Sequence, residues 1–453
     1  MKIRKIMAVT LSFLILLQYG TLLGCGKKDE LKILDKDKQM IASLEQITSD
    51  KTELSDYEYR AYLEIVIAEG KQMIADLQQC TLEEAEKQLL CDGYTIYTSF
   101  DNDIFQSIKN AYETQKETRL AFGCAVTDLK GNLLAVHSAG ETSDAYTNFA
   151  TAETSPYSSL KPLSVYAPAI ESGSITWSQV YEDSPLKEIA DGEGEMRDWP
   201  KNATGTYSYE NETVAAAIRQ SLNTVAVKCL QSYGVNRSLD FLKNSFGINL
   251  KFERNKAAMS GEEEVLGNVA LGYLYSGVSP VNMAGYYQIF ANGGIYYAPH
   301  TILKICDRNG KTVCESSDQG TRVVKKTTAY IMNRLLQGVV SYGGTGEAAG
   351  CDDIVVGGKT GTGDDGNWFV GFTPQYSCAI WHGKELPQNH AAELFSEVVS
   401  RFAHNSEKSF PECSDIKEAV YCCESGLLLS DKCRKIDRGY YAPDCMPAIC
   451  DKH

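Results

Sequence analysis

The chain has 453 residues, 43% of which are hydrophobic, and a formal net charge of -15. This length and composition suffice for a full hydrophobic core and for more than one domain. Because the charge balance is acidic and no basic patch is evident, nucleic acid is excluded as an expected partner.

Residues 1–24 have the features of a secretory signal peptide. A basic start, MKIRK, precedes an apolar run over residues 6–17 that is too short to span a membrane comfortably. The signal ends in Leu-Leu-Gly-Cys, which resembles the lipid-attachment signal of bacterial lipoproteins, so we expect Cys25 to carry a lipid. An uncleaved signal anchor is the alternative. Both interpretations attach the protein to the membrane and put the rest of the chain on the extracytoplasmic face.

Residues 25–92 are expected to form a stalk followed by a helical linker. The stretch 26–55 is polar and charged, which is typical of a stalk. Apolar residues then recur at helical spacing between 59 and 77. A capping box formed by Thr81 and Glu84 predicts the start of a second, shorter helix.

Residues 93–408 mix strand and helix patterns. β-Branched and aromatic residues predict a strand at 94–98, and a Lys-Gly-Asn turn predicts a β-hairpin over 120–136. Residues 160–245 are predicted to be mainly helical, and residues 296–325 to form strands. A helix is predicted at 326–340, followed by a strand–loop–strand unit at 354–381. Because strands occur early and late with helices between them, the predicted fold class is α+β.

Three short motifs occur in a fixed order along this region. They are Ser-x-x-Lys at 158–161, Ser-x-Asn at 221–223 and Lys-Thr-Gly at 359–361. The first motif is weak by itself, because it also occurs at 184–187 and 414–417. The copy at 158–161 is preferred because it stands at the predicted start of a helix and has prolines on both sides.

The third motif could be mistaken for a nucleotide-binding loop. Gly358, Lys359 and Thr360 match the end of a Walker A sequence, which also requires a glycine five positions before Gly358. That position is Asp353, followed by an apolar stretch typical of a strand. Phosphate binding is therefore rejected, and the lysine is expected to bind a different anion.

The residues of the three motifs suit acyl transfer through a serine. The hydroxyl of Ser158 needs a base, and Lys161, one turn later on the same helix face, can act as that base when neutral. Burial and the nearby cation of Lys359 would lower the pKa of Lys161. Ser221 would relay the proton toward the leaving amine, and Asn223 would hold a substrate amide.

The same motifs also predict how a substrate is bound. Lys359, Thr360 and Thr362 would bind a terminal carboxylate, which is the anion that the lysine requires. Glycine at position 361 (Gly361) would allow an extended peptide to lie against the strand and add to the sheet edge. The backbone amides of Ser158 and Thr362 are expected to form an oxyanion hole.

Residues from about 93 to 405 resemble the transpeptidase domain of penicillin-binding proteins, closest to the bifunctional class A type. Besides the motifs, the resemblance rests on GYTIYTSFD (93–101), KPLSVYAPAIESGSIT (161–176), YSGVSPVNMAGYYQIFANGGIY (275–296), GTGEAAG (344–350) and WFVGFTPQY (368–376). It implies a β-lactamase/D,D-peptidase-like fold, in which helices flank a central antiparallel sheet and part of the domain is all-helical.

The resemblance implies a D,D-transpeptidase that cross-links peptidoglycan. Its serine attacks the bond between two terminal D-alanines of a stem peptide, β-lactams such as penicillins acylate the same serine, and no cofactor or metal takes part. Class A proteins also carry a glycosyltransferase domain before the transpeptidase. Only about 65 residues separate Cys25 from the first matching strand, which is too few for such a domain. We therefore expect a separate glycosyltransferase as a partner.

Two other functions remain open at this point. A D,D-carboxypeptidase or a serine β-lactamase would use the same three motifs with water as the acyl acceptor. A non-catalytic penicillin sensor or wall-binding scaffold would bind the same ligands without turnover. The intact Ser158 and Lys161 argue against the scaffold.

Residues 409–453 form a cysteine-rich C-terminal extension, similar to the tail of some Gram-positive family members. Six of the 15 cysteines of the chain lie in it: Cys413, Cys422, Cys423, Cys433, Cys445 and Cys450. Disulfides are permitted outside the membrane, but their pairing does not follow from the spacing. A zinc site using these cysteines and His453 would lack two C-x-x-C pairs, so disulfides or thiols are expected in its place.

Overall fold

A computed structural model describes residues 30–43, 58–115, 121–140, 146–190, 194–316, 319–403 and 409–452. The predicted signal peptide, Cys25 and His453 lie outside the described residues. None of the helices in the described ranges is long and apolar enough to cross a membrane.

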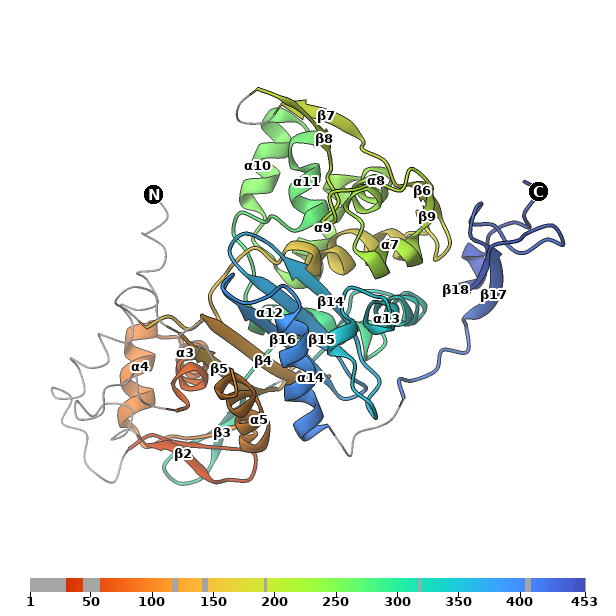
Figure 1. Cartoon of the computed structure of the whole chain (residues 1–453). Coiled ribbons are helices and arrows are strands. Elements are labelled where there is room, and N and C mark those ends of the chain that lie inside the picture. Colours follow the sequence, from red (N-terminus) through yellow and green to blue (C-terminus); the bar gives the residue numbers. More distant parts are fainter. Residues whose placement is uncertain are drawn as a thin grey trace.

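The first of two five-stranded sheets in the described part of the chain has the order β14-β15-β16-β4-β5 (Figure 1). Each strand is antiparallel to its neighbours, so the predicted central antiparallel sheet is present. The bounds are β4 Phe122–Asp128, β5 Leu133–Ala139, β14 Gly357–Thr362, β15 Asn367–Phe372 and β16 Tyr376–His382. The strand β14, which contains the Lys-Thr-Gly motif, is an edge of this sheet.

Helices cover both faces of this first sheet. Alternate side chains of β15 point to opposite faces, so each face offers side chains for a helix to pack against. Phe369 contacts Phe395 of helix α14 (His390–Phe402), with 4.8 Å between the ring centroids. On the other face, Phe372 lies 6.1 Å from Phe290, next to helix α12. The remaining helices near the sheet are α5 (Asn102–Glu113), α12 (Pro280–Tyr287) and α13 (Lys326–Val340), the last with the predicted bounds.

The second sheet has the order β12-β11-β3-β1-β2. Its strands are β1 Lys32–Leu34, β2 Met40–Ser43, β3 Thr95–Thr98, β11 Ile302–Cys306 and β12 Thr312–Glu315. Residues 30–43 were expected to be a stalk, and the structure corrects this expectation. Leu31 and Ile33 are fully buried there, but strands of three or four residues are too short to give a clear pattern in a polar segment.

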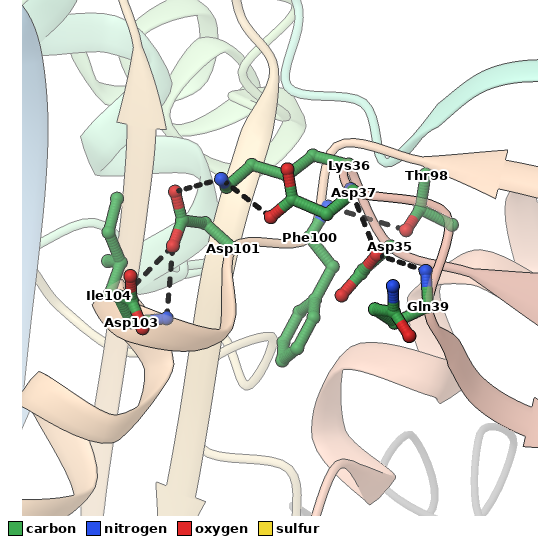
Figure 2. Close-up of polar contacts among 9 residues, drawn as sticks. All are labelled: Asp35, Lys36, Asp37, Gln39, Thr98, Phe100, Asp101, Asp103 and Ile104. Atoms are coloured by element: carbon green, nitrogen blue, oxygen red, sulfur yellow. Dashed lines mark hydrogen bonds and ion pairs between the residues drawn. The ribbon is translucent and has the colours of Figure 1, made fainter.

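Polar contacts also fix the turn between β1 and β2, as Figure 2 shows. Asp35 Oδ1 accepts a hydrogen bond from the N–H of Asp37 at 2.9 Å. Lys36 Nζ lies 2.9 Å from Asp37 Oδ2 and 3.7 Å from Asp101 Oδ2. Asp101 is also the N-cap of α5, so the turn is attached to the start of a helix that packs on the first sheet.

The predicted linker helices are present as α3 (Arg60–Gln78) and α4 (Leu82–Cys91). The capping box at the start of α4 is confirmed, since Thr81 Oγ1 accepts the N–H of Glu84 and the Glu84 carboxylate accepts the N–H of Thr81. α3 packs against α4, β5 and β11, so it is part of the folded body rather than a separate linker.

The all-helical subregion lies above the edge of the first sheet in Figure 1. It contains α6 Ala167–Glu171, α7 Val214–Gln220, α8 Asn223–Tyr233, α9 Val235–Phe246, α10 Lys251–Ser260 and α11 Glu263–Leu271. Two small antiparallel strand pairs interrupt it. β6 (Val180–Glu182) pairs with β9 (Asn211–Thr213), and between them in the chain β7 (Lys187–Ala190) pairs with β8 (Met196–Trp199). The sequence analysis missed these strands because they are short, largely exposed and show no alternation of apolar residues.

The C-terminal extension forms a hairpin of β17 (Lys417–Cys422) and β18 (Ile436–Tyr441) beyond α13 (Figure 1). It contacts the body through Tyr440, whose ring lies 5.1 Å from that of Trp177 and 5.9 Å from that of Tyr330. A further two-stranded sheet pairs β10 (Ile295–Tyr296) with β13 (Thr321–Arg322).

We predict that Ile33→Ala destabilises the whole domain, because the Ile33 side chain is fully buried in the second sheet. The expected loss in the free energy of unfolding is about 2–5 kcal/mol, measured by urea denaturation. Met40→Ala is the matched control, since Met40 lies on the neighbouring strand but is 57% exposed. Equal stability of the two variants would contradict the docking of residues 30–43.

Candidate active site

Ser158 and Lys161 lie at the start of one continuous helical segment. A 3₁₀ turn, η2 (Tyr157–Leu160), is followed by Lys161 and then by a π-helical turn over Pro162–Tyr166. The N–H of Lys161 donates to the carbonyl of Ser158, and side chains three positions apart eclipse each other in a 3₁₀ turn. Ser158 is half-buried, whereas Lys161 is fully buried. The hydroxyl can therefore meet a ligand while the amine is kept from water.

Tyr157, directly before the serine, has a strained backbone. Its φ is 50°, a left-handed value that is uncommon for a bulky residue. Its N–H donates to the carbonyl of Gly272 at 3.1 Å, and its hydroxyl accepts the N–H of Asp365 at 3.2 Å. The ring also meets that of Tyr273 edge-on at 5.2 Å. Strain held in this way is typical of functional sites, and the sequence analysis missed it because no residue type signals it.

The amine of Lys161 is held by the break between two helices. Lys161 Nζ donates to the carbonyl of Ser221 at 2.8 Å and to Asn223 Oδ1 at 2.7 Å, and it lies 3.4 Å from Ser221 Oγ. Ser221 ends α7 with a left-handed φ of 56°, and Asn223 begins α8. The sharp turn between these helices directs both residues of the second motif toward Lys161.

Lys359 approaches the same hydroxyl from the edge of the sheet. It is fully buried, and its Nζ donates to Ser221 Oγ at 2.9 Å and to Thr360 Oγ1 at 3.3 Å. Thr360 Oγ1 in turn donates to Thr345 Oγ1 at 3.2 Å. Thr345 belongs to the GTGEAAG stretch, which was expected to line the site. The hydroxyl of Ser221 thus lies between the amines of Lys161 and Lys359.

The electrostatics favour a neutral Lys161. Burial lowers the pKa of Lys161 well below its ordinary value, and the positive charge of Lys359 lowers it further. Burial also lowers the pKa of Lys359, to about 7. Burial and the charge of Lys359 are the two causes that the sequence analysis predicted for a lowered pKa of Lys161. A neutral amine at Lys161 offers a lone pair that can accept a proton.

Asn223 is supported by a buried polar network. Its N–H donates to Asn202 Oδ1 at 2.9 Å, and its Nδ2 donates to the carbonyl of Lys201 at 2.7 Å. Asn202 Nδ2 donates to the buried Asp183 at 2.7 Å, which also accepts the hydroxyl of Thr224 at 2.5 Å. The sequence analysis missed Asp183 and Asn202, because neither belongs to a motif.

The contacts of Asn223 also bear on its predicted role. Both of its amide atoms are engaged within the protein, with Lys161 and with the carbonyl of Lys201. This geometry shows Asn223 orienting the amine of Lys161. Binding of a substrate amide by Asn223 remains a prediction.

Gly361 lets β14 lie directly against the turn that carries Ser158. A Cβ atom at Gly361 would lie 2.4 Å from the carbonyl oxygen of Pro156 and 3.1 Å from the N of Ser159. Packing against Pro156 therefore explains why position 361 is a glycine. This reason differs from the predicted one, the close approach of a peptide. Thr362 follows on β14 and is exposed. The roles of the Ser158 and Thr362 amides as an oxyanion hole remain a prediction.

Possible metal ligands gather elsewhere in the described residues. The sulfur atoms of Cys422, Cys433 and Cys450 lie within 4.8 Å of one another in the C-terminal extension. Around Ser158 the polar groups are amines, hydroxyls and amides, which suit anion binding and proton transfer.

A family model of the penicillin-binding protein transpeptidase domain matches residues 122–398. This match covers more than half of the chain, and the chain therefore belongs to the family of penicillin-binding protein transpeptidase domains. The match includes all three motifs, although it does not by itself assign roles to their residues.

Several curated relatives are penicillin-binding proteins. Penicillin-binding protein 1A of Clostridium acetobutylicum is 30% identical over 345 residues, which cover 70% of this chain and 41% of the relative. Penicillin-binding protein 1F of Bacillus subtilis is 33% identical over 334 residues, which cover 70% of this chain and 43% of the relative. The chain therefore spans about two fifths of the length of these relatives.

Solved structures show the same fold. Penicillin-binding protein 1A from Haemophilus influenzae superposes with a TM-score of 0.66 at 18% identity, covering 85% of this chain and 76% of that chain. The D,D-transpeptidase domain of a peptidoglycan glycosyltransferase from Eggerthella lenta gives 0.63 at 20% identity, covering 83% and 99%. The predicted α+β penicillin-binding fold is thereby confirmed.

We predict that Gly361→Ala lowers the free energy of unfolding by about 1–3 kcal/mol, because its methyl group would overlap the Pro156 carbonyl. Gly338→Ala is the matched control, since no heavy atom lies within 4 Å of a Cβ at Gly338 in helix α13. That variant should be as stable as the parent or more stable by up to about 1 kcal/mol. Thermal denaturation compares the two, and a stable Gly361→Ala protein would contradict the close packing of β14 on η2.

Proposed function

We propose that this protein is a peptidoglycan D,D-transpeptidase that acts through an acyl-serine intermediate at Ser158. The observation that carries the proposal is the environment of Lys161, a fully buried amine whose pKa is lowered, located one turn after a half-buried serine. Membership in the transpeptidase family supports the same reaction.

The first half of the reaction forms the acyl-enzyme. Lys161 Nζ takes the proton of Ser158 Oγ, and Oγ attacks the carbonyl carbon of the penultimate D-alanine. The amides of Ser158 and Thr362 stabilise the negative oxygen that develops. Ser221 Oγ, 3.4 Å from Lys161 Nζ, then passes the proton to the amine of the departing D-alanine. The lowered pKa of Lys161 supports each of these steps, because a charged amine could not begin them.

The carboxylate of the terminal D-alanine would bind beside Lys359, Thr360 and Thr362. Burial disfavours the charge of Lys359, and a bound carboxylate would restore it by favourable electrostatic interaction. The peptide would run along β14, because an edge strand has backbone groups available for another extended chain.

The second half of the reaction transfers the acyl group to an acceptor. In a transpeptidase the acceptor is an amine of a neighbouring stem peptide, whereas a carboxypeptidase or a β-lactamase uses water. The match to the model of a transpeptidase domain favours the amine. A non-catalytic wall-binding scaffold is disfavoured, since it would need neither a nucleophilic serine nor a neutral lysine next to it.

The cellular setting is also a proposal. The signal-like residues 1–24 and Cys25 support a lipid-anchored protein on the extracytoplasmic face of the bacterial membrane. We further propose that glycan strands come from a separate glycosyltransferase that associates with this protein. Co-purification from membranes tests this association, and recovery of the protein without any such enzyme would argue against it.

We predict that benzylpenicillin forms a covalent adduct of one molecule per chain at Ser158. Intact-mass spectrometry should detect it in the parent protein and not in Ser158→Ala. Ser414→Ala is the matched control, because Ser414 also begins a Ser-x-x-Lys sequence but is exposed in the extension. A folded parent protein without an adduct would contradict the catalytic proposal.

The fate of the acyl group separates the remaining functions. With a stem peptide that ends in D-alanyl-D-alanine and an added amine acceptor, a transpeptidase gives a cross-linked product and free D-alanine. A carboxypeptidase gives only the shortened peptide. Rapid loss of the penicillin adduct with release of opened drug would identify a β-lactamase, and adduct formation without peptide turnover would identify a sensor.

We predict that acylation by a carboxylate-bearing β-lactam becomes slower as the pH rises above neutrality. The pKa of Lys359 is lowered to about 7, so the free protein loses the cation that binds the carboxylate. The second-order rate constant should fall about fivefold between pH of about 7 and about 8. Lys359→Arg should lack this fall, because a guanidinium stays charged. Identical pH profiles for the parent and this variant would contradict the assignment.

A further inference from the structure

The C-terminal extension brings three cysteines together from distant positions in the sequence. Cys422 ends strand β17, Cys433 lies in the loop before β18, and Cys450 lies near the end of the described chain. Their three sulfur atoms are all within 4.8 Å of one another. Cys422 and Cys450 are buried, so the cluster is formed inside the extension rather than on its surface.

Backbone hydrogen bonds hold two of these cysteines side by side. The N–H of Cys422 donates to the carbonyl of Leu427 at 2.8 Å, which closes the turn after β17. The next residue, Leu428, donates to the carbonyl of Ala448 and accepts the N–H of Cys450, both at 2.8 Å. The last segment of the chain is therefore fixed alongside this turn, with Cys450 next to Cys422.

Hydrogen-bond donors surround two of the sulfur atoms. The N–H of Ser430 lies 3.4 Å from Cys433 Sγ, and the hydroxyl of Ser425 donates to Cys450 Sγ at 3.2 Å. Donors in these positions stabilise negative charge on sulfur, and second contacts of this kind orient and tune the ligands of metal sites. These contacts orient the sulfur atoms of Cys433 and Cys450 within the cluster.

The geometry suits a metal ion better than a disulfide. Zn²⁺ bonds thiolates at about 2.3 Å in a tetrahedron, so its sulfur ligands lie roughly 3.8 Å apart, which falls within the 4.8 Å limit of this cluster. A disulfide joins only two sulfur atoms, at about 2.05 Å, and would leave the third cysteine of the cluster unused. Soft thiolates select zinc over calcium or magnesium.

The extension also has little else to stabilise it. Its buried side chains include Tyr421, Tyr441, Cys422 and Cys450, which is a small core for residues 409–452. Below about 40–50 residues, a domain usually needs disulfides, a metal or a partner surface for stability. A metal bound by three separate segments would fix the hairpin, its loop and the end of the chain to one another.

We propose that Cys422, Cys433 and Cys450 bind one Zn²⁺ ion as the structural centre of the extension. The three thiols lose their protons to solvent when the metal binds. The three thiolates fill three of the four tetrahedral positions of the ion. This site replaces the disulfides or thiols that the spacing alone favoured.

The metal would also order a contact with the catalytic domain. Gly426, in the turn directly after Cys422, accepts the buried hydroxyl of Ser178 at 2.6 Å. Ser178 follows Trp177, which packs against Tyr440 of the extension. The turn that the metal fixes is therefore one of the contacts between the extension and the helical subregion.

The first test measures the metal content of the purified full chain by plasma mass spectrometry. We expect one zinc per chain in the parent protein and a loss of this zinc in Cys422→Ser, Cys433→Ser and Cys450→Ser. Cys413→Ser and Cys445→Ser are matched controls, because these cysteines lie in the same extension outside the cluster. Metal contents that do not differ between the two groups of variants would overturn the proposal.

A second measurement uses the parent protein, so it does not depend on the folding of a variant. Mass spectrometry follows the alkylation of each cysteine by iodoacetamide before and after zinc is removed with a chelator. We expect Cys422, Cys433 and Cys450 to be protected until the metal is removed. Equal alkylation in both states, or a disulfide between two of the three in protein isolated without reductant, would overturn the proposal. The penicillin adduct at Ser158 reports separately that the catalytic domain is folded.

Discussion

The structure depends on two buried lysines that share one hydroxyl. Lys161 and Lys359 both contact Ser221 Oγ, at 3.4 and 2.9 Å, in a region from which water is largely removed. Two full positive charges are unfavourable at such a site, so the arrangement favours deprotonation of one amine. The fold places the two amines next to this hydroxyl. It brings together a helix start, a helix–helix break and a sheet edge, each of which supplies one motif.

Close backbone contacts set the distances between these elements. Gly361 brings β14 against the carbonyl of Pro156, and Gly272 brings its own backbone against Tyr157, where a Cβ would lie 2.0 Å from the Tyr157 carbonyl oxygen. Tyr157 itself has a left-handed φ of 50°. The serine that follows is therefore held by rigid packing on both sides. This rigidity is what an acyl-transfer site needs, because small displacements of a nucleophile are costly.

The sequence predicted the parts of this site that have strong local signals. Hydrogen bonds link the motif residues in a chain from Asn223 through Lys161 and Ser221 to Lys359. The helix over 326–340 has the predicted bounds. What it missed depends on contacts between distant residues. Asp183 and Asn202 are common polar residues that gain a role only once they are packed beneath α8. Strands β1 and β2 are too short for a periodic pattern, and they become strands because β1 pairs with β3 and β2 pairs with β1.

The order of the strands has a consequence for how the chain folds. Strand β4, at residues 122–128, lies between β5 and β16, and β16 spans residues 376–382. In the second sheet, β3 at 95–98 pairs with β11 at 302–306. Both sheets therefore join early and late parts of the chain. Such a high contact order slows folding, because long loops must close, at a cost in chain entropy, before strand pairing can stabilise the fold. Neither sheet can therefore be completed until most of the chain has been synthesised.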